Sequence, residues 1–156
     1  MTHILRFLQV FTLGTWLGGI LFLSFALAPA AFGTLASPDE AGALVGLVLA
    51  RLHSFGCIAG VIFLLAAVFE ARSLRALLRP AALCVILMLA LTAASRWGVT
   101  PRMASLRAQM VSVDRTPRDN PRRVEFGRLH RISVNLESGV LLLGLAALFL
   151  TVRNHR

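Results

Sequence analysis

The chain has 156 residues, of which 57% are hydrophobic and 15% are charged, and its formal net charge is +9. A soluble protein has about 45–50% apolar and about 25% charged residues, and one domain of this length has no core large enough to bury the excess. The composition therefore excludes a soluble domain and indicates an integral membrane protein. Arginines in such a protein mark loops and lipid head groups, so we expect the lipid bilayer, and no nucleic acid, as a partner.

The first predicted membrane span covers about residues 4–28 and ends before Pro29. Arg6 lies near its start and a small-residue triplet closes it, as in a secretory signal peptide. Its apolar stretch is, however, longer than the about 7–15 residues of a signal peptide's apolar region. We therefore expect this segment to be retained as a span.

The second predicted span covers about residues 52–70 and belongs to a longer helix. Ser37, Pro38 and Glu40 form a capping box with proline at the first helical position, which predicts a helix start at this point. No helix-breaking residue follows before about residue 71. The helix therefore exceeds the about 20 residues that cross the hydrocarbon core, and its first part is expected to protrude or to lie in the interface.

The third predicted span covers about residues 80–97, and the fourth covers about residues 132–152. Between them, residues 98–131 form a predicted extra-membrane region of helix and loop, with a stretch rich in proline and charge. Asn120 as N-cap and Pro121 at the first helical position predict the start of the last helix.

These elements predict an all-α fold, in which residues 1–156 form a single four-helix transmembrane domain. Short connections favour an up-down bundle, with helices that extend beyond the bilayer on the side opposite the termini. We expect an integral protein of the bacterial inner membrane. Glycines recur four residues apart, which allows helices to approach closely within the bundle and leaves a homo-oligomer open. These glycines are Gly14 and Gly18, Gly42 and Gly46, and Gly56 and Gly60.

Polar residues gather at one predicted depth of the bundle. In an up-down arrangement, the start of the second helix, the end of the third and the start of the fourth lie at the same level. Each of these segments carries polar side chains next to an apolar span. They are His53 and Ser54, then Thr92, Ser95 and Arg96, and finally His130, Ser133, Asn135 and Glu137.

Glu137 is the most unusual member of this polar layer. The apolar run that follows it, residues 139–150, is too short to span a membrane alone, so residues 133–138 must also lie within it. A carboxylate at that depth is costly unless it is protonated or paired. We expect Arg96 or His53 as its partner, either in a structural ion pair or in a functional site.

A metal or haem site is a weaker hypothesis for the same layer. His53 and Cys57 lie four residues apart on one helical face, and with His130 they offer ligands that suit Zn or Cu. His53 and His130 alone could bind haem b between two helices. The chain has no HExxH or CxxC spacing, so we expect no cofactor and keep these sites as alternatives. Cys57 and Cys84 are placed near opposite helix ends, which argues against a disulfide.

Arginines flank the polar layer and favour an anionic ligand. Arg102 and Arg107 follow the third span and Arg128 precedes the fourth, where they can attract an anionic lipid head group or a small anion. No hydrolase or phosphate-binding-loop motif is present, so we expect no enzyme. The candidate ligand-binding residues are His53, Arg96, Arg102, Arg107, His130, Ser133, Asn135 and Glu137.

The preferred function is therefore to bind, or to help transport, a small or lipidic anionic ligand at the basic end. One alternative is a haem- or metal-binding redox protein that uses His53 and His130. Another is a structural subunit of a membrane complex.

Three stretches resemble a small four-span membrane family similar to transmembrane protein 205. They are residues 15–52, which begin with TWLGG, residues 100–107 (TPRMASLR) and residues 126–133 (FGRLHRIS). The resemblance implies a four-helix membrane protein without established biochemistry. His53 and Glu137 lie outside its motifs, whose recurring positions are Trp16, Gly18, Gly19, Pro29, Phe32, Gly42, Pro101, Arg107, Phe126, His130 and Ser133.

Overall fold

The computed structural model describes residues 2–153. In this part of the chain it contains no strand, and its α-helices are α1 (Thr2–Phe22), α2 (Ala28–Thr34), α3 (Pro38–Ala71), α4 (Pro80–Ala93), α5 (Thr100–Ala108) and α6 (Pro121–Arg153). The π-helical segments Leu23–Leu27 and Ala94–Val99 join α1 to α2 and α4 to α5, and a 3₁₀ helix, Leu74–Leu78, precedes α4. Four continuous rods result, each long and apolar enough to cross a membrane. The predicted all-α bundle of membrane helices is confirmed.

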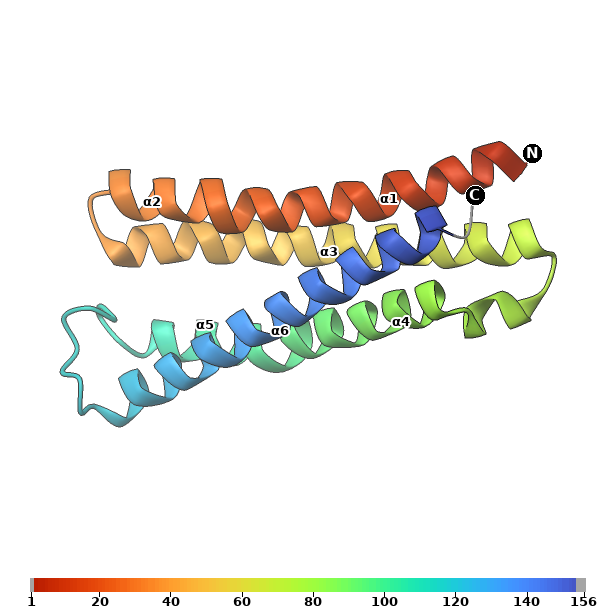
Figure 1. The fold of residues 1–156 in the computed structure, drawn as a ribbon. Helices are drawn as coiled ribbons and strands as arrows, with labels where there is room; N and C mark the ends of the chain where they lie inside the picture. Colours follow the sequence, from red (N-terminus) through yellow and green to blue (C-terminus); the bar gives the residue numbers. More distant parts are fainter. Residues whose placement is uncertain (1, 154–156) are drawn as a thin grey trace.

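The rods pack as an up-down bundle in which α1 and α4 each contact α3 and α6. Figure 1 shows that the start of α1 and the end of α6 lie at one end of this bundle, which we call the terminal end. The turn from α3 into α4 lies there too. The opposite end, which we call the extended end, holds α2, the start of α3, α5, the loop 109–120 and the start of α6.

The rods are longer than a bilayer is thick. They have between 29 and 34 residues, which at 1.5 Å per residue gives about 44–51 Å against a hydrocarbon core of about 30 Å. The excess length allows the polar start of α6 and the polar end of α5 to lie outside the hydrocarbon core.

Two prolines explain the π-helical segments. Pro29 and Pro101 each occupy the second position of the helix that follows such a segment. A proline inside a helix removes one amide donor and clashes with the carbonyl four residues earlier, and a widened turn relieves both effects. The rod therefore continues through Pro29 to Thr34, although the sequence predicted an end before the proline. At the second site, the Thr100 hydroxyl donates to the Ser95 carbonyl at 3.0 Å.

The two long helices begin at their predicted caps. The Ser37 hydroxyl accepts a hydrogen bond from the Glu40 amide at 3.2 Å, with Pro38 at the first helical position. The Asn120 side-chain oxygen accepts from the Arg122 amide at 2.9 Å, and α6 starts at Pro121. Both signals are local in sequence, which is why they can be identified without knowledge of the fold.

The core lies where α1, α3, α4 and α6 meet. Trp16 of α1 packs directly on Gly56 of α3, where an added Cβ would lie only 2.3 Å from the indole Nε1 atom. Any side chain at residue 56 would therefore overlap the ring. A Cβ added at Gly14 or Gly18 would meet no atom of another helix within 4 Å, and the predicted homo-oligomer stays a prediction. The core includes Leu13, Trp16, Leu17, Ile20, Phe63, Val85, Met88 and Val140.

Candidate functional site

Glu137 on α6 lies against His53 on α3, one of its two predicted partners. The His53 Nε2 atom is 3.1 Å from Glu137 Oε2. His53 is 1% exposed and the Glu137 side chain is 14% exposed. An ionised carboxylate can only accept hydrogen bonds, so in the ionised form of Glu137 the donor of this contact is a protonated Nε2 atom of His53. The contact supplies the partner that a carboxylate at this depth requires.

Arg96, the other predicted partner, is bonded to α3 instead. Its Nη1 atom donates to the Ala50 carbonyl at 3.0 Å and to the Ser54 hydroxyl at 2.5 Å. Arg96 lies in the π-helical segment Ala94–Val99, whose wider turn changes the direction of side chains relative to a regular helix. The segment thus joins the middle of the third rod to α3 next to His53.

The polar layer is partly buried and partly exposed. Thr92, Ser95 and Ser133 are buried, together with His53. Within residues 2–153, neither His53 Nδ1 nor the Ser95 hydroxyl has a hydrogen-bond partner. Buried polar atoms are normally hydrogen-bonded, so these two atoms are the places where the layer can accept a further group.

Three predicted site residues do not join this buried cluster. His130 and Asn135 of α6 are exposed, and so is Arg102 of α5. His130 was expected in the polar layer, but its neighbour Leu129 occupies the buried position at that level. At this level α6 has a different packing partner, because its start packs on α5.

Arg107 lies in the last turn of α5 and is held between two other helices. Its guanidinium carbon is 5.4 Å from the centre of the Phe126 ring on α6. On the α3 side it packs against Gly42, where an added Cβ would lie 2.8 Å from Arg107 Nη2. Its Nε atom is buried and has no hydrogen-bond partner among the described residues. Packing therefore fixes the position of this cation, whose charge also acts on the Asp39 carboxylate without a direct ion pair.

Asp39 joins the loop 109–120 to the start of α3, outside the predicted membrane part of that helix. Its carboxylate accepts from the Ser112 hydroxyl at 2.5 Å and from the Val113 amide at 3.1 Å. The Ser112 hydrogen bond, with weaker help from Val113, Arg107 and Asp114, holds the pKa of Asp39 below its ordinary value. Sequence reasoning missed this role, because Asp39 reads only as an acidic residue in the first turn of a helix.

A second polar cluster at the terminal end was also missed. The Glu70 carboxylate accepts from Arg6 Nε at 2.7 Å and from Gln9 Nε2 at 2.8 Å. Gln9 is 5% exposed although it lies in an apolar rod. The available signal was a polar residue inside the first predicted span, which is unusual enough in lipid to require a partner.

Residues 2–153 contain no group of three or more His, Cys, Asp or Glu side chains that could hold a metal ion. His53, Cys57 and His130 are therefore not gathered into such a group, and the metal hypothesis stays a prediction. Cys57 and Cys84 are both free thiols. The haem hypothesis stays a prediction.

Comparison with known proteins gives one match. A family described as a domain of unknown function (DUF4149) matches residues 11–112, which is more than half of the chain and covers α2 to α5 with most of α1. No curated protein and no solved structure matches the chain. The narrower resemblance to transmembrane protein 205 therefore has no support beyond the motifs that suggested it. The chain belongs to the DUF4149 family and is an integral membrane protein with four apolar helices.

Proposed function

We propose that the extended end binds an anionic lipid head group, or a small anion of the same chemistry, with Arg107 as the central contact. The position of Arg107 carries this proposal. Its guanidinium is held between Gly42 and Phe126, and it forms no ion pair with a carboxylate of residues 2–153. A planar guanidinium matches the oxygens of phosphate and carboxylate groups. Because packing already restricts this side chain, it loses little conformational entropy when it binds an anion.

The charge distribution at the extended end supports the same ligand. Arginines outnumber carboxylates there, and two of the carboxylates are occupied: Asp39 binds the loop and Glu137 binds His53. Such an excess attracts anionic head groups over about one Debye length. The arginines are Arg51, Arg96, Arg102, Arg107, Arg115, Arg118, Arg122, Arg123, Arg128 and Arg131.

The depth of these arginines is also appropriate. Trp97 is 69% exposed and lies next to Arg96, an arrangement that is typical of the membrane interface. Arg102 follows five residues later, about 7.5 Å along the rod, which is within the head-group layer. Arg107 lies a further five residues on, so it is accessible from the outer edge of that layer and from water.

A thermal-shift experiment on the detergent-purified chain tests the proposal. The probe is phosphatidylmethanol, an anionic lipid whose head group carries no hydrogen-bond donor, and phosphatidylcholine is the neutral comparison. Inorganic phosphate in a separate arm distinguishes a free anion from a lipid. We expect phosphatidylmethanol to raise the unfolding temperature of the wild type and of Arg115→Gln, a matched variant in the exposed loop.

Arg107→Gln should lose most of this stabilisation, and Arg107→Lys should lose part of it, because lysine keeps the charge without the planar fork. Full stabilisation of Arg107→Gln, or equal stabilisation by phosphatidylcholine, would contradict the proposal. The unfolding temperature without lipid is measured for each variant, so that a folding defect is recognised separately.

One observation favours a second candidate, the redox protein. His53 is buried with its Nδ1 atom unpartnered among the described residues, and a free imidazole nitrogen is a common metal ligand. An absorption spectrum and elemental analysis of the purified chain would distinguish the two functions. A haem Soret band or a stoichiometric metal that is lost in His53→Leu would favour the redox function.

A further inference from the structure

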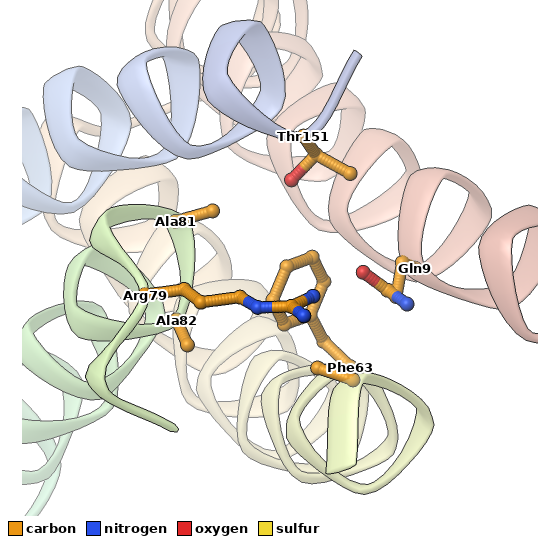
Figure 2. A pocket seen from close by; sticks show the side chains of 7 residues that line it. Gln9, Phe63, Arg79, Ala81, Ala82 and Thr151 are labelled. Atoms are coloured by element: carbon orange, nitrogen blue, oxygen red, sulfur yellow. The ribbon is translucent and has the colours of Figure 1, made fainter. Parts of the chain in front are cut away.

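A small cavity opens at the terminal end, away from the residues proposed above. Figure 2 shows it between α1, α3, α4 and α6, with the Arg79 side chain extending toward Gln9 and Phe63. Its volume is about 30 Å³, enough for about two water-sized groups. Polar residues from three parts of the chain line it, namely Gln9, Arg79 and Thr151, over an apolar floor that includes Phe63, Ala81 and Ala82.

The inner polar atoms of this cavity are hydrogen-bond acceptors. Gln9 uses its amide nitrogen to bind Glu70, so its oxygen is the atom left for the cavity, and Figure 2 shows that oxygen on the side of Arg79. Thr151 donates its hydroxyl proton to the Ala147 carbonyl at 2.7 Å and keeps lone pairs free. The carboxylate of Glu70 lies behind Gln9 and is itself paired with Arg6. The inside of the cavity therefore suits a donor such as a hydroxyl or an ammonium group.

The cavity also has one cationic lining residue, Arg79, whose side chain extends toward Gln9 (Figure 2). Arg79 is exposed and precedes α4 as its N-cap residue. Its guanidinium makes no ion pair with a carboxylate of residues 2–153, and it is therefore available to a phosphate or carboxylate group from outside. A mainly apolar cavity with two acceptors beside an exposed guanidinium fits a ligand that carries an anionic group next to a donor.

The size and the position of the cavity further restrict the kind of ligand that it can bind. About 30 Å³ is too little for a whole phosphate ester, but it fits the terminal amine or hydroxyl of a head group while the phosphate stays at Arg79. Gln9 lies near the start of the first predicted span and Arg79 directly before the third, so the cavity is at interface depth. Exposed apolar side chains two positions from lining residues in the sequence, Phe7 beside Gln9 and Leu83 beside Ala81, offer a surface for acyl chains.

We propose that this cavity binds the head group of a phospholipid with a terminal hydrogen-bond donor, with phosphate on Arg79 and the donor on Gln9. Phosphatidylethanolamine has this chemistry. Phosphatidylcholine carries the same phosphate and the same net charge, but its quaternary ammonium has no N–H to donate. The two lipids therefore differ at the atom that the cavity would recognise.

Native mass spectrometry of the detergent-purified full chain, titrated with each lipid, tests this inference. We expect the wild type to bind phosphatidylethanolamine about tenfold more tightly than phosphatidylcholine, the effect of one charge-assisted hydrogen bond. Arg79→Gln should weaken both lipids, and Gln9→Met should remove the preference between them. Arg75→Gln, in the exposed part of the same turn, should match the wild type.

A soluble arm with glycerophosphoethanolamine distinguishes a free head-group ester from the membrane lipid. Competition that is lost in Arg79→Gln would assign the site to the head group alone, and absence of competition would assign it to the intact lipid. Equal binding of the two lipids by the wild type, or an undiminished preference in folded Gln9→Met, would overturn the inference. Because Arg107 plays no part in these measurements, their outcome is independent of the proposed function of the extended end.

Discussion

The imidazole of His53 and the carboxylate of Glu137 meet at 3.1 Å and join α3 to α6 inside the bundle. The two residues are 84 positions apart in the sequence. They lie at the depth where the last rod changes from polar to apolar residues. The pair therefore gives Glu137, the carboxylate of the fourth span, the partner that it needs inside the membrane.

Removal of one member of this pair should cost more than removal of both. His53→Leu leaves Glu137 without its partner and should lower the free energy of unfolding by about 3 kcal/mol. In the double variant His53→Leu/Glu137→Leu, apolar groups replace the pair, and much of that stability should return. Thermal and denaturant unfolding of the wild type, His53→Leu, Glu137→Leu and the double variant in the same detergent completes this double-mutant cycle. Additive losses in the double variant would contradict a direct interaction.

The hydrogen bonds of Arg96 should contribute measurably to the packing of the third rod on α3. Arg96→Leu removes two bonds, to the Ala50 carbonyl and the Ser54 hydroxyl, and should cost about 1–3 kcal/mol. Arg51→Leu removes an exposed arginine from the neighbouring turn and should change stability by less than about 0.5 kcal/mol. Equal unfolding temperatures for the two variants would show that the hydrogen bonds of Arg96 do not contribute to the stability of the fold.

The close contact between α1 and α3 should depend on glycine at residue 56. Gly56→Ala places a Cβ 2.3 Å from the Trp16 indole and should destabilise the bundle by about 1–3 kcal/mol through overpacking. Gly18→Ala adds the same methyl group to α1 where nothing lies within 4 Å, and it should be neutral or slightly stabilising. Thermal unfolding monitored by tryptophan fluorescence compares the two. A neutral Gly56→Ala would mean that the helices are further apart than described.

Asp39 should hold the loop 109–120 in place. Asp39→Asn weakens the acceptor for Ser112 and Val113, so trypsin should cleave faster after Arg115 and Arg118. Glu40→Gln changes an exposed acid at the next position and should leave the cleavage rate unchanged.

The same loop should loosen in the wild type at low pH. Folding lowers the pKa of Asp39 from 3.8, so the ionised carboxylate stabilises the fold above that value, and the contribution is lost as pH falls through the lowered pKa. Hydrogen exchange at the Val113 amide, corrected for the intrinsic rate at each pH, measures this. Protection that is independent of pH down to 2 would contradict the role of the carboxylate.

The features that could be predicted from sequence are local or compositional. Ser37 and Asn120 predict helix starts from a signal only a few residues long. The apolar spans follow from length and composition alone. The depth of Glu137 followed from the short apolar run after it, which limited its partners to two. The choice between Arg96 and His53 as the partner of Glu137 depends on how the third rod is rotated about its own axis. That rotation depends on a π-helical turn, which no sequence periodicity indicates.

The contacts that could not be predicted join distant parts of the chain. Glu70 meets Arg6 and Gln9 across more than sixty residues, and Asp39 meets Ser112 across 73. Neither pair has a spacing signal, because which faces meet is decided by side-chain packing between rods. The continuation of the first rod through Pro29 was missed for a different reason: a proline predicts a break, and a widened turn accommodated it.

The most direct test of the central claim is the amount of anionic lipid that stays bound to the chain when Arg107 is changed. Native mass spectrometry after delipidation and incubation with phosphatidylmethanol gives this amount for the wild type, Arg107→Gln and Arg115→Gln. We expect one tightly retained lipid on the wild type and on Arg115→Gln, and at least a tenfold weaker adduct on Arg107→Gln. The same retention by all three proteins would contradict an anion site at Arg107.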